Sequence, residues 1–406
     1  MTTRRNIFPF AETTPLLRLV FWFILGIVAG AYSSLSALLL LAALALTLPL
    51  ALLLRHHPLY QSLTLCVALF LLGATLAARQ RDQVRASGMT VRQWVQAQKE
   101  PDGNTMTGRS RLFFLQQREK LLEHYRQQHF DADTYALVAA MTLGDRRALD
   151  QDLRQTYNIS GAAHVLALSG LHMGIIYTLL TLLTFNRRRR VITQAVIIAI
   201  LWIFVFLVGM PASAVRAATM LSLYALLTLG YREKASINAL AFTAFAMLLL
   251  SPYTLFDVGF QMSFLAVLSI LVWMPVVNSW VSPVLQQRWP PLRWVWGLTA
   301  VTLTAQLGVA PLIAFYFGRF STYFLLTSFI AIPAVTIIVW LALTTLLIPM
   351  AAPLLSVVTN GLNTSLDTIA RLPGASIENL HPTLLQTILT YVLILCIYWI
   401  IQHYQL

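Results

Sequence analysis

Residues 164–172, with the sequence HVLALSGLH, place two histidines and one serine in an otherwise apolar stretch. A serine beside a histidine can act as a nucleophile with its base, and two histidines can contribute ligands to a metal ion. Ionisable side chains in a membrane protein can also line an aqueous path, or can only hydrogen-bond neighbouring helices. No Asp or Glu stands nearby to orient a catalytic histidine or to complete a metal site. We therefore favour the aqueous path and expect no catalytic residue, metal ion or cofactor.

The three polar side chains, His164, Ser169 and His172, are expected to share one face of a helix. If residues 162–185 are helical, a rotation of about 100° per residue places the three within an arc of about 140°. Ser169 and His172 are also neighbours at positions i and i+3 of such a helix. The pattern predicts one broad polar face that is available to a channel.

Further polar residues that suit a channel lining stand before and after this stretch. A compact charged turn at residues 144–147 precedes it and contains Asp145 and Arg146. Later apolar runs contain an arginine, two amides and a hydroxyl: Arg216, Gln261, Ser263 and Gln306. Such a lining, positive or neutral, suits an anionic or polar permeant.

Acidic residues are scarce in the apolar part of the chain. Between Asp152 and Asp257 the only one is Glu233. Carriers coupled to protons or sodium commonly use a carboxylate within a span, and a two-metal nuclease needs clustered acidic ligands. An ATP motor would need a Gly-x4-Gly-Lys-Ser/Thr loop, which the sequence does not contain. The sequence therefore disfavours all three classes.

The composition indicates a membrane protein. The 406 residues are 58% hydrophobic and 11% charged, whereas soluble domains carry about 25% charged residues. Apolar runs of roughly 20 residues, the length that crosses a bilayer, recur along nearly the whole chain. Proline and glycine within or beside these runs predict broken or kinked helices. We expect an all-α, polytopic transmembrane helical bundle of about ten spans.

Four segments follow from the distribution of apolar and charged residues. We expect N-terminal spans over 1–77, a short amphipathic extracytoplasmic segment over 78–133, a channel core over 134–350 and C-terminal membrane segments over 351–406. An amphipathic helix is predicted at 111–130. Clusters of arginine and lysine gather on the cytoplasmic side of membrane proteins, which predicts a cytoplasmic N-terminus and an external extracytoplasmic segment.

At this point the residues resemble a known family. Residues 144–177, GDRRALDQDLRQTYNISGAAHVLALSGLHMGIIY, resemble the signature of the ComEC-type competence family. The segments at 211–221, 251–271 and 302–334 resemble the family too, and they occur in the family's order. The resemblance covers roughly 140–350, the family's competence region.

The resemblance implies an inner-membrane channel that passes one strand of DNA into the cytoplasm during natural transformation. It also implies a cytoplasmic helicase-like motor and an external DNA receptor as partners. His164, Ser169 and His172 occupy positions of the family's motif, without individual roles. The OB-type and metallo-β-lactamase-like domains of long family members are not found in this sequence. We therefore expect a transport channel without nuclease activity, and a separate nuclease for the second strand.

A DNA strand requires a cationic path. The chain carries a formal net charge of +13, and such a path holds nucleic acid by its phosphates. Candidate contacts on the outer segment are Arg79, Arg81, Arg85, Arg109 and Arg111. Those on the cytoplasmic side are Arg187, Arg188, Arg189 and Arg190, for which a role as a topology anchor is the alternative.

We therefore expect a multi-pass channel in the inner, cytoplasmic membrane that is surrounded by membrane lipids and translocates single-stranded DNA. Two alternatives stay open. The first is an intramembrane Ser/His hydrolase that acts on lipid or cell-wall material. The second is an exporter or flippase of an anionic lipid or polymer, which keeps the channel architecture and changes the permeant.

Overall fold

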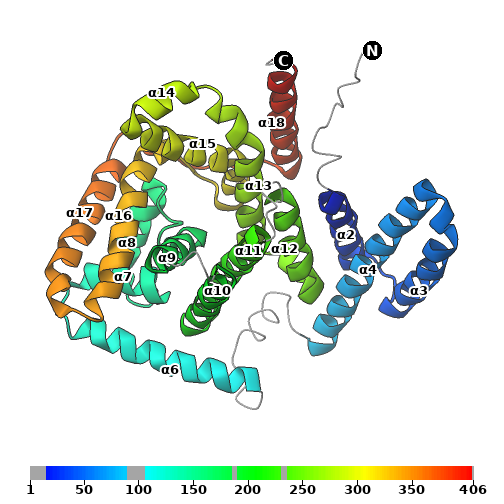
Figure 1. Ribbon diagram of the computed structural model, residues 1–406, viewed down its shortest axis with the longest axis horizontal. Helices are drawn as coiled ribbons and strands as arrows, with labels where there is room; N and C mark the ends of the chain where they lie inside the picture. The colour runs from blue at the N-terminus through cyan, green and yellow to red at the C-terminus, as the bar shows by residue number, and fades with distance from the viewer. Residues whose placement is uncertain (1–14, 89–105, 185–189, 230–235, 405–406) are drawn as a thin grey trace. The chain divides into compact units, whose positions relative to one another are not determined.

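Helices make up nearly all of the described part of the chain. The computed structural model describes residues 15–88, 106–184, 190–229 and 236–404, and this part of the protein is almost entirely helical (Figure 1). The expectation of an all-α, polytopic architecture is confirmed.

The chain packs as two units. Unit 1 combines Met1–Asp102 with Gly230–Gln261, and unit 2 combines Gly103–Leu229 with Met262–Leu406. Each unit therefore joins stretches that are far apart in the sequence. The four consecutive segments expected from the sequence stay a prediction.

Unit 1 is built around a close pair of helices, α2 and α4. Its elements are α2 (Pro15–Tyr32), α3 (Ala37–Leu53), η1 (Leu54–His56), α4 (Pro58–Ser87), α12 (Ser236–Leu250) and η3 (Pro252–Phe256). Gly26 and Gly30 of α2 lie against the backbone of α4, where a methyl group would overlap with Phe70 and Ala74. Gly73 of α4 lies equally close to α2. Small residues four apart allow such an approach between helices.

Unit 2 holds a buried core around helix α7. Its elements are α6 (Met106–Arg126), α7 (Ala132–Leu143), α8 (Gln151–Ser160), α9 (Gly170–Leu183), α10 (Arg190–Leu207), α11 (Ala212–Leu229), most of α13 (Val258–Asn278), α14 (Pro283–Arg288), α15 (Pro290–Phe317), β1 (Phe320–Ser321), α16 (Phe324–Thr345), η4 (Pro349–Ala351), α17 (Ala352–Ala370), β2 (Ser376–Ile377) and α18 (Leu384–Tyr404). Residues 136–143 of α7 are all buried. Helices α6, α16 and α17 pack on α7, and α9, α10 and α11 extend the same core.

The helix predicted at 111–130 is present as α6 and lies along one edge of unit 2 (Figure 1). It packs on α7 and α10. Leu122 and Tyr125 are fully buried, and the Tyr125 hydroxyl donates a hydrogen bond of 2.9 Å to the carbonyl of Ala342. Its apolar stripe therefore faces protein, and α6 is docked on the bundle.

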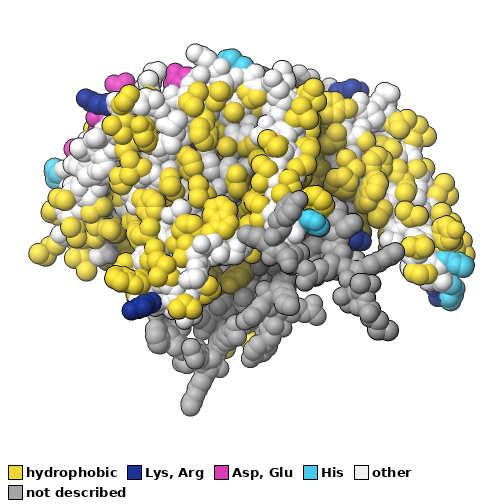
Figure 2. Space-filling model, turned by 90° about the horizontal axis from the view of Figure 1, so that it is seen from above, with side chains coloured by type: hydrophobic (Ala, Val, Ile, Leu, Met, Phe, Trp, Pro, Cys, Tyr) yellow, Lys and Arg dark blue, Asp and Glu magenta, His cyan; other side chains and the backbone are white. Residues whose placement is uncertain are grey.

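Seven described helices are long and apolar enough to cross a membrane. They are Pro15–Tyr32, Ala37–His56, Pro58–Ser87, Val258–Asn278, Pro290–Phe317, Phe324–Thr345 and Leu384–His403. Five shorter apolar helices, including α7, α9 and α11, accompany them. Figure 2 shows hydrophobic side chains over most of the face that it displays, as expected for a surface in contact with lipid. The protein is a multi-pass membrane protein.

The C-terminal part differs between its two helices. α17 is amphipathic and packs on α16 and α8, and it is not among the candidate membrane spans of the described chain. α18 is mostly apolar and largely exposed, so it is the C-terminal candidate. Between them, β2 pairs antiparallel with β1, with Phe320 opposite Ile377 and Ser321 opposite Ser376.

Candidate functional site

The polar stretch identified in the sequence is a break between two helices. α8 ends at Ser160, and Gly161 follows with a left-handed φ of +87°. α9 begins only at Gly170. The predicted helix over 162–185 is therefore wrong in its first part, because residues 162–169 form turns. We refer to residues 161–169 as the break.

The break changes how the three polar side chains are arranged. Ser169 and His172 form a capping box at the start of α9, in which each side chain accepts a hydrogen bond from the other residue's backbone. The Ser169 hydroxyl lies 3.0 Å from His172 Nδ1. His164 stands earlier in the break, and its Nδ1 lies 3.2 Å from the carbonyl of Gly161. The three residues therefore do not share one helical face, which corrects the expectation.

The hydrogen bonds of His172 define its tautomer. Its Nδ1 accepts from the backbone N–H of Ser169 at 3.3 Å, so a neutral ring carries its proton on Nε2. Nε2 is buried and has no hydrogen-bond partner among the described residues. The capping box therefore leaves the buried Nε2–H group of His172, at the edge of the break, without a hydrogen-bond partner among the described residues.

Two distant helices satisfy the carbonyl groups that the break exposes. The Thr327 hydroxyl of α16 donates to the carbonyl of Ser160 at 2.7 Å. The Ser213 hydroxyl of α11 donates to the carbonyl of Leu168 at 2.6 Å. Irregular backbone at membrane depth is tolerated where protein supplies such partners. The break is therefore held at both ends by side chains from elsewhere in unit 2.

Gly161 lets strand β1 approach the break. A Cβ atom built on Gly161 would lie 2.8 Å from the Ser321 Oγ and 2.9 Å from its Cβ. The left-handed φ of Gly161 also disfavours any side chain. Both the conformation and the contact require glycine at this position.

Arg216 lies on the face of α11 that contacts the break. Ser213, Arg216 and Ala217 stand at positions i, i+3 and i+4 and so share a face. Ser213 binds the break, and Ala217 lies 3.9 Å from a Cβ built on Gly170. Arg216 is only 5% exposed. The structure thus places a buried arginine on the face of α11 that packs against the break.

The charged turn at 144–147 is folded around Asp145. The Arg147 guanidinium binds this carboxylate through Nε at 2.9 Å and Nη2 at 2.7 Å, and the Arg147 backbone N–H donates to it as well. These hydrogen bonds from Arg147 lower the pKa of Asp145 below its ordinary value. Asp145 is only 4% exposed, so it organises the turn and is not open to a permeant.

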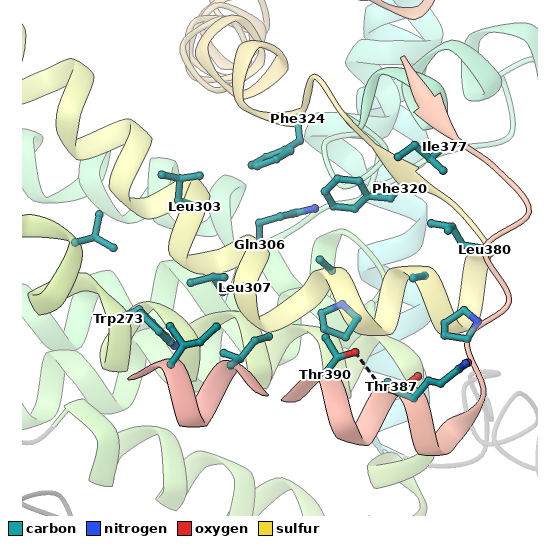
Figure 3. Close-up of a pocket in the computed structure, with 18 of the residues that line it drawn as sticks. Trp273, Leu303, Gln306, Leu307, Phe320, Phe324, Ile377, Leu380, Thr387 and Thr390 are labelled. Atoms are coloured by element: carbon teal, nitrogen blue, oxygen red, sulfur yellow. Dashed lines mark hydrogen bonds between the residues drawn. The ribbon is translucent and has the colours of Figure 1, made fainter. Parts of the chain in front are cut away.

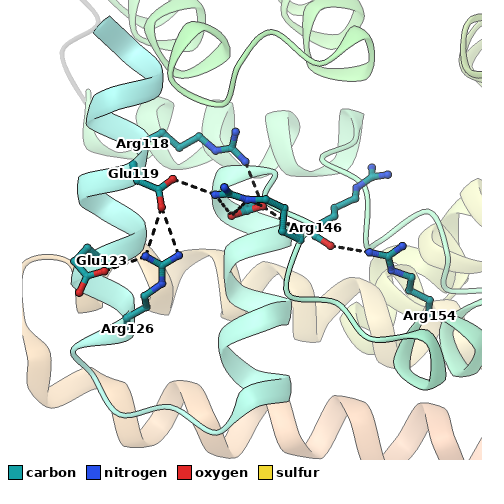
Figure 4. A network of polar contacts seen from close by, with 8 residues as sticks. Arg118, Glu119, Glu123, Arg126, Arg146 and Arg154 are labelled. Carbon is teal, nitrogen blue, oxygen red and sulfur yellow. Dashed lines mark hydrogen bonds and ion pairs between the residues drawn. The ribbon is translucent and has the colours of Figure 1, made fainter. Parts of the chain in front are cut away.

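Arg146 and Arg154 lie together on the outside of the same turn. The Arg154 guanidinium donates a hydrogen bond of 2.7 Å to the carbonyl of Arg146, as Figure 4 shows. Partial burial and the neighbouring charge of Arg154 lower the pKa of Arg146. The predicted site residues Asp145 and Arg146 therefore have different surroundings. The charge of Asp145 is neutralised by Arg147, whereas Arg146 lies near a second positive charge, that of Arg154.

Arg81, which we expected to contact DNA, is engaged inside unit 1. Its guanidinium donates to the carbonyls of Gly30 at 3.2 Å and Leu35 at 2.7 Å, and also to that of Ser33. It forms an ion pair with Asp82 as well. With 6% exposure, Arg81 stabilises the end of α2, and we remove it from the candidate DNA contacts.

The remaining candidate arginines have different surroundings. Arg111 donates a hydrogen bond of 3.0 Å to the carbonyl of Gly209. Arg187–Arg189 lie outside the described residues, and Arg190 begins α10. Three of the candidates have exposed side chains: Arg79, Arg85 and Arg109. Among the candidates in the described part of the chain, these three stay predicted DNA contacts.

Gln306 lines a large groove in unit 2. The groove has a volume of about 960 Å³ and lies between α13, α15, α18 and the residues around β1 and β2. Its lining is mainly apolar, and Figure 3 shows Gln306 directed into it, towards Phe320. Thr387 and Thr390 of α18 lie on the opposite wall. Gln306 therefore lines an open groove, and no residue of the break lines this groove.

Gln261 and Ser263 occupy the start of α13. The Gln261 amide donates to the carbonyl of Leu255 at 3.0 Å, and Asp257 accepts from the backbone N–H of Phe260. These contacts stabilise the entry into the helix. Gln261 is the last residue of unit 1, whereas Ser263 belongs to unit 2 and is partly buried.

Several residues of the site were missed in the sequence. Thr327 and Ser213 hold the break, and Arg118 reaches Asp145 from α6 at 3.8 Å. A hydroxyl in an apolar helix gives no signal of its own, because threonine and serine usually bond to their own helix. The arginines at 147 and 154 lay within the quoted signature and could have been selected by their charge.

Parts of this chain are similar to one described family and to several known proteins. The family described as "Competence protein" matches residues 141–404. ComE operon protein 3 of Bacillus subtilis is 30% identical over 208 residues, which are 50% of this chain and 25% of that protein. Recombination protein 2 of Haemophilus influenzae is 26% identical over 258 residues, 60% of this chain and 31% of that protein. The chain thus spans about a quarter to a third of these relatives, and no solved structure matches it.

Proposed function

Because the chain belongs to the family of ComEC-type competence proteins, we propose that it is a channel for DNA uptake. In this proposal it lies in the inner membrane and translocates single-stranded DNA into the cytoplasm during natural transformation. The observation that carries the proposal is the family match over 141–404, which contains the charged turn, the break and the groove. The break supplies polar, irregular backbone of the kind that membrane proteins keep where it lines a path.

The charges of unit 2 support an anionic permeant. Arginines surround the charged turn, and Arg216 is buried on the same face of α11 as Ser213, which binds the break. Phosphates of a single strand are attracted by such groups, and the attraction weakens as salt concentration rises. A strand that entered at the turn would have to travel only the length of α8, about 15 Å at 1.5 Å per residue, to reach the break.

The proposal includes partners. A cytoplasmic helicase-like motor would supply the energy for translocation, and an external receptor would deliver DNA. A separate nuclease would degrade the second strand. These partners come with the family assignment, and each can be tested by co-purification with the full chain.

The proposed function is tested by DNA uptake in cells. We expect a strain without the gene to lose entry of fluorescently labelled DNA into the cytoplasm, and a plasmid copy to restore it. Unchanged uptake in the deletion strain would contradict the proposal. Loss of transport of an anionic lipid or polymer, with DNA uptake intact, would favour an exporter or flippase instead.

A hydrolase is the second candidate because the Ser169 hydroxyl lies 3.0 Å from His172 Nδ1. The same two residues form a capping box, however, and this role needs an N-cap acceptor and not a nucleophile. Ser169→Asn keeps an N-cap acceptor and removes the nucleophile, whereas Ser169→Ala removes both. We expect DNA uptake to survive in Ser169→Asn and to fall in Ser169→Ala. Loss in both variants, together with labelling of wild-type Ser169 by a fluorophosphonate, would favour the hydrolase.

A further inference from the structure

A cavity lined by arginines lies beside the charged turn of unit 2. It has a volume of about 640 Å³ and is formed by α6, by the turn after α7 and by α8. The residues that line it are Leu115, Arg118, Glu119, Gly144, Asp145, Arg146, Arg147 and Arg154. We call it the arginine cavity. Figure 4 shows its arginines approaching from three separate elements.

Both carboxylates of the arginine cavity are already engaged. Asp145 is bound by Arg147 at 2.7 Å. Glu119 binds Arg147 through Oε2 at 3.0 Å and Arg126 through Oε1 at 3.4 Å. The lining thus contains four arginines and two carboxylates. Arg147 makes the shortest ion pair with each of the two carboxylates.

Three guanidinium groups are left without a carboxylate of their own. Arg118 reaches only Asp145, at 3.8 Å, and its Nε is buried with no hydrogen-bond partner in the described part of the chain. Arg154 donates to a neutral carbonyl, that of Arg146. For Arg146 and Arg154, no carboxylate lies within ion-pair distance among residues 15–88, 106–184, 190–229 and 236–404. The cavity therefore carries uncompensated positive charge.

The geometry points to a phosphate ligand. A guanidinium presents a planar fork of donors that matches the oxygens of a phosphate group. Like charges held near one another repel, and a bound anion removes this cost. A phosphate accepts hydrogen bonds in several directions, so arginines from three elements can bind it at once. A single carboxylate offers fewer acceptors and is less suited to this arrangement.

We propose that the arginine cavity is a phosphodiester-binding site and that its occupant is a backbone phosphate of the DNA strand, held by Arg118, Arg146 and Arg154. The identity of the occupant rests on the proposed function, whereas the site itself rests on the cavity and its charges. The site lies at the N-terminal end of α8 and the break at its C-terminal end. Phosphate capture at one end of α8 would thus precede entry at the other.

The test is oligonucleotide binding by the full chain in nanodiscs of phosphatidylcholine. A fluorescent oligo-dT is titrated and its anisotropy is followed at several salt concentrations. We expect Arg118→Gln and Arg154→Gln each to weaken binding about tenfold. Each should also lower the slope of log affinity against log salt by about 0.7, the value for one lost phosphate contact on a single strand. Thermal unfolding midpoints identify any variant that fails to fold.

Two matched controls come from the same network. Arg126 lies on α6 like Arg118 but is exposed, does not line the cavity and binds Glu119 and Glu123. Arg126→Gln should change affinity less than twofold. Glu119→Gln removes a negative charge from the lining and should strengthen binding, because the cavity becomes more positive.

Three outcomes would overturn the inference. If wild type binds the oligonucleotide and the Arg118 and Arg154 variants bind equally well, the cavity is not the site, and the proposed function stands. Retention of phosphatidylglycerol is measured separately, after purification of each variant from membranes that contain this lipid. If the Arg118 and Arg154 variants lose phosphatidylglycerol but still bind oligo-dT, the occupant is a lipid headgroup. If wild type binds no oligonucleotide, the DNA occupant is wrong, while the uptake assay decides the proposed function separately.

Discussion

The two ends of α8 illustrate two ways in which this protein uses polar groups. At its C-terminal end, the carbonyls at the two ends of the break accept hydrogen bonds from the hydroxyls of Ser213 and Thr327. At its N-terminal end, the arginine cavity holds more positive than negative groups. The carbonyls at the two ends of the first region already have partners within the protein, whereas the second region gains from a ligand.

This difference has a physical basis. An unpaired carbonyl in a membrane protein costs several kcal/mol, so irregular backbone is kept only where partners are built in. The side chains of Arg146 and Arg154 are exposed to water when no ligand is bound, so their charge is available to bind an anion. The hydrogen-bonded carbonyls therefore fix the conformation of the break, and the arginines without a carboxylate partner determine which ligand the cavity can bind.

The largest effect is expected from Gly161→Ala, which attacks the shape of the break. The left-handed backbone costs an alanine about 1–2 kcal/mol, and the contact with Ser321 adds an overpacking cost of about 1–3 kcal/mol. The unfolding midpoint of the purified protein should fall clearly, and DNA uptake should be lost. Gly174→Ala is the control, since nothing lies near a Cβ at that helical position. Equal stability of the two variants would show that the break is not rigid.

Asp145→Asn should have the next largest effect, and it tests whether the stability that the charged turn contributes depends on pH. Loss of the charged hydrogen bonds from Arg147 should cost about 1–3 kcal/mol at neutral pH. The folded-state pKa of Asp145 is lowered from 3.8, so its stabilisation is complete above that value and is lost as pH falls through the lower, folded pKa. The difference in unfolding midpoint between wild type and variant should therefore shrink below about pH 4.

Asp367→Asn is the control for this pH dependence, because Asp367 forms an exposed ion pair with Arg371 one turn away. Its midpoint should follow wild type at every pH. A wild-type advantage over Asp145→Asn that persisted unchanged at pH 3 would contradict the assigned role of the Asp145 carboxylate.

Thr327→Val should have a smaller effect, because it removes one hydrogen bond from the break. The carbonyl of Ser160 loses its 2.7 Å donor, at a cost of about 1 kcal/mol. Thr336→Val is the matched control on the same helix, since its hydroxyl bonds to Ile332 within α16. Thermal unfolding should separate the two variants, and proteolysis near residues 161–169 should increase only in the first. Identical behaviour would show that the break does not depend on α16.

The smallest effect is expected for Arg126→Gln, at the exposed edge of the arginine network. Its ion pairs with Glu119 and Glu123 are solvent-accessible, and such pairs contribute about 0–1 kcal/mol. The unfolding midpoint should change little and should become insensitive to the substitution at high salt. A large loss would mean that the network stabilises the fold and that its charge is not reserved for a ligand.

Local patterns predicted much of the fold. The apolar runs predicted the helices, and the stripe of Leu112, Leu115, Leu122 and Tyr125 predicted α6. Leu122 and Tyr125 are indeed fully buried. The helical expectation failed at residues 162–169, because an apolar stretch looks alike in a helix and in a packed turn. Arg81 was misjudged because its carbonyl partners, Gly30, Ser33 and Leu35, lie about 50 residues away at the end of α2 and just after it.

The sequence by itself determined the helical membrane architecture, the family and the position of the polar stretch, because these depend on composition and on short motifs. Only the tertiary structure decided what the polar groups do. The hydroxyl that binds the carbonyl of Leu168 is 45 residues away, and the one that binds Ser160 is 167 residues away. Arg118 joins the arginine cavity from a separate helix in the same manner. Hydrogen bonds and ion pairs act over a few ångströms, and only folding brings such distant residues within that range.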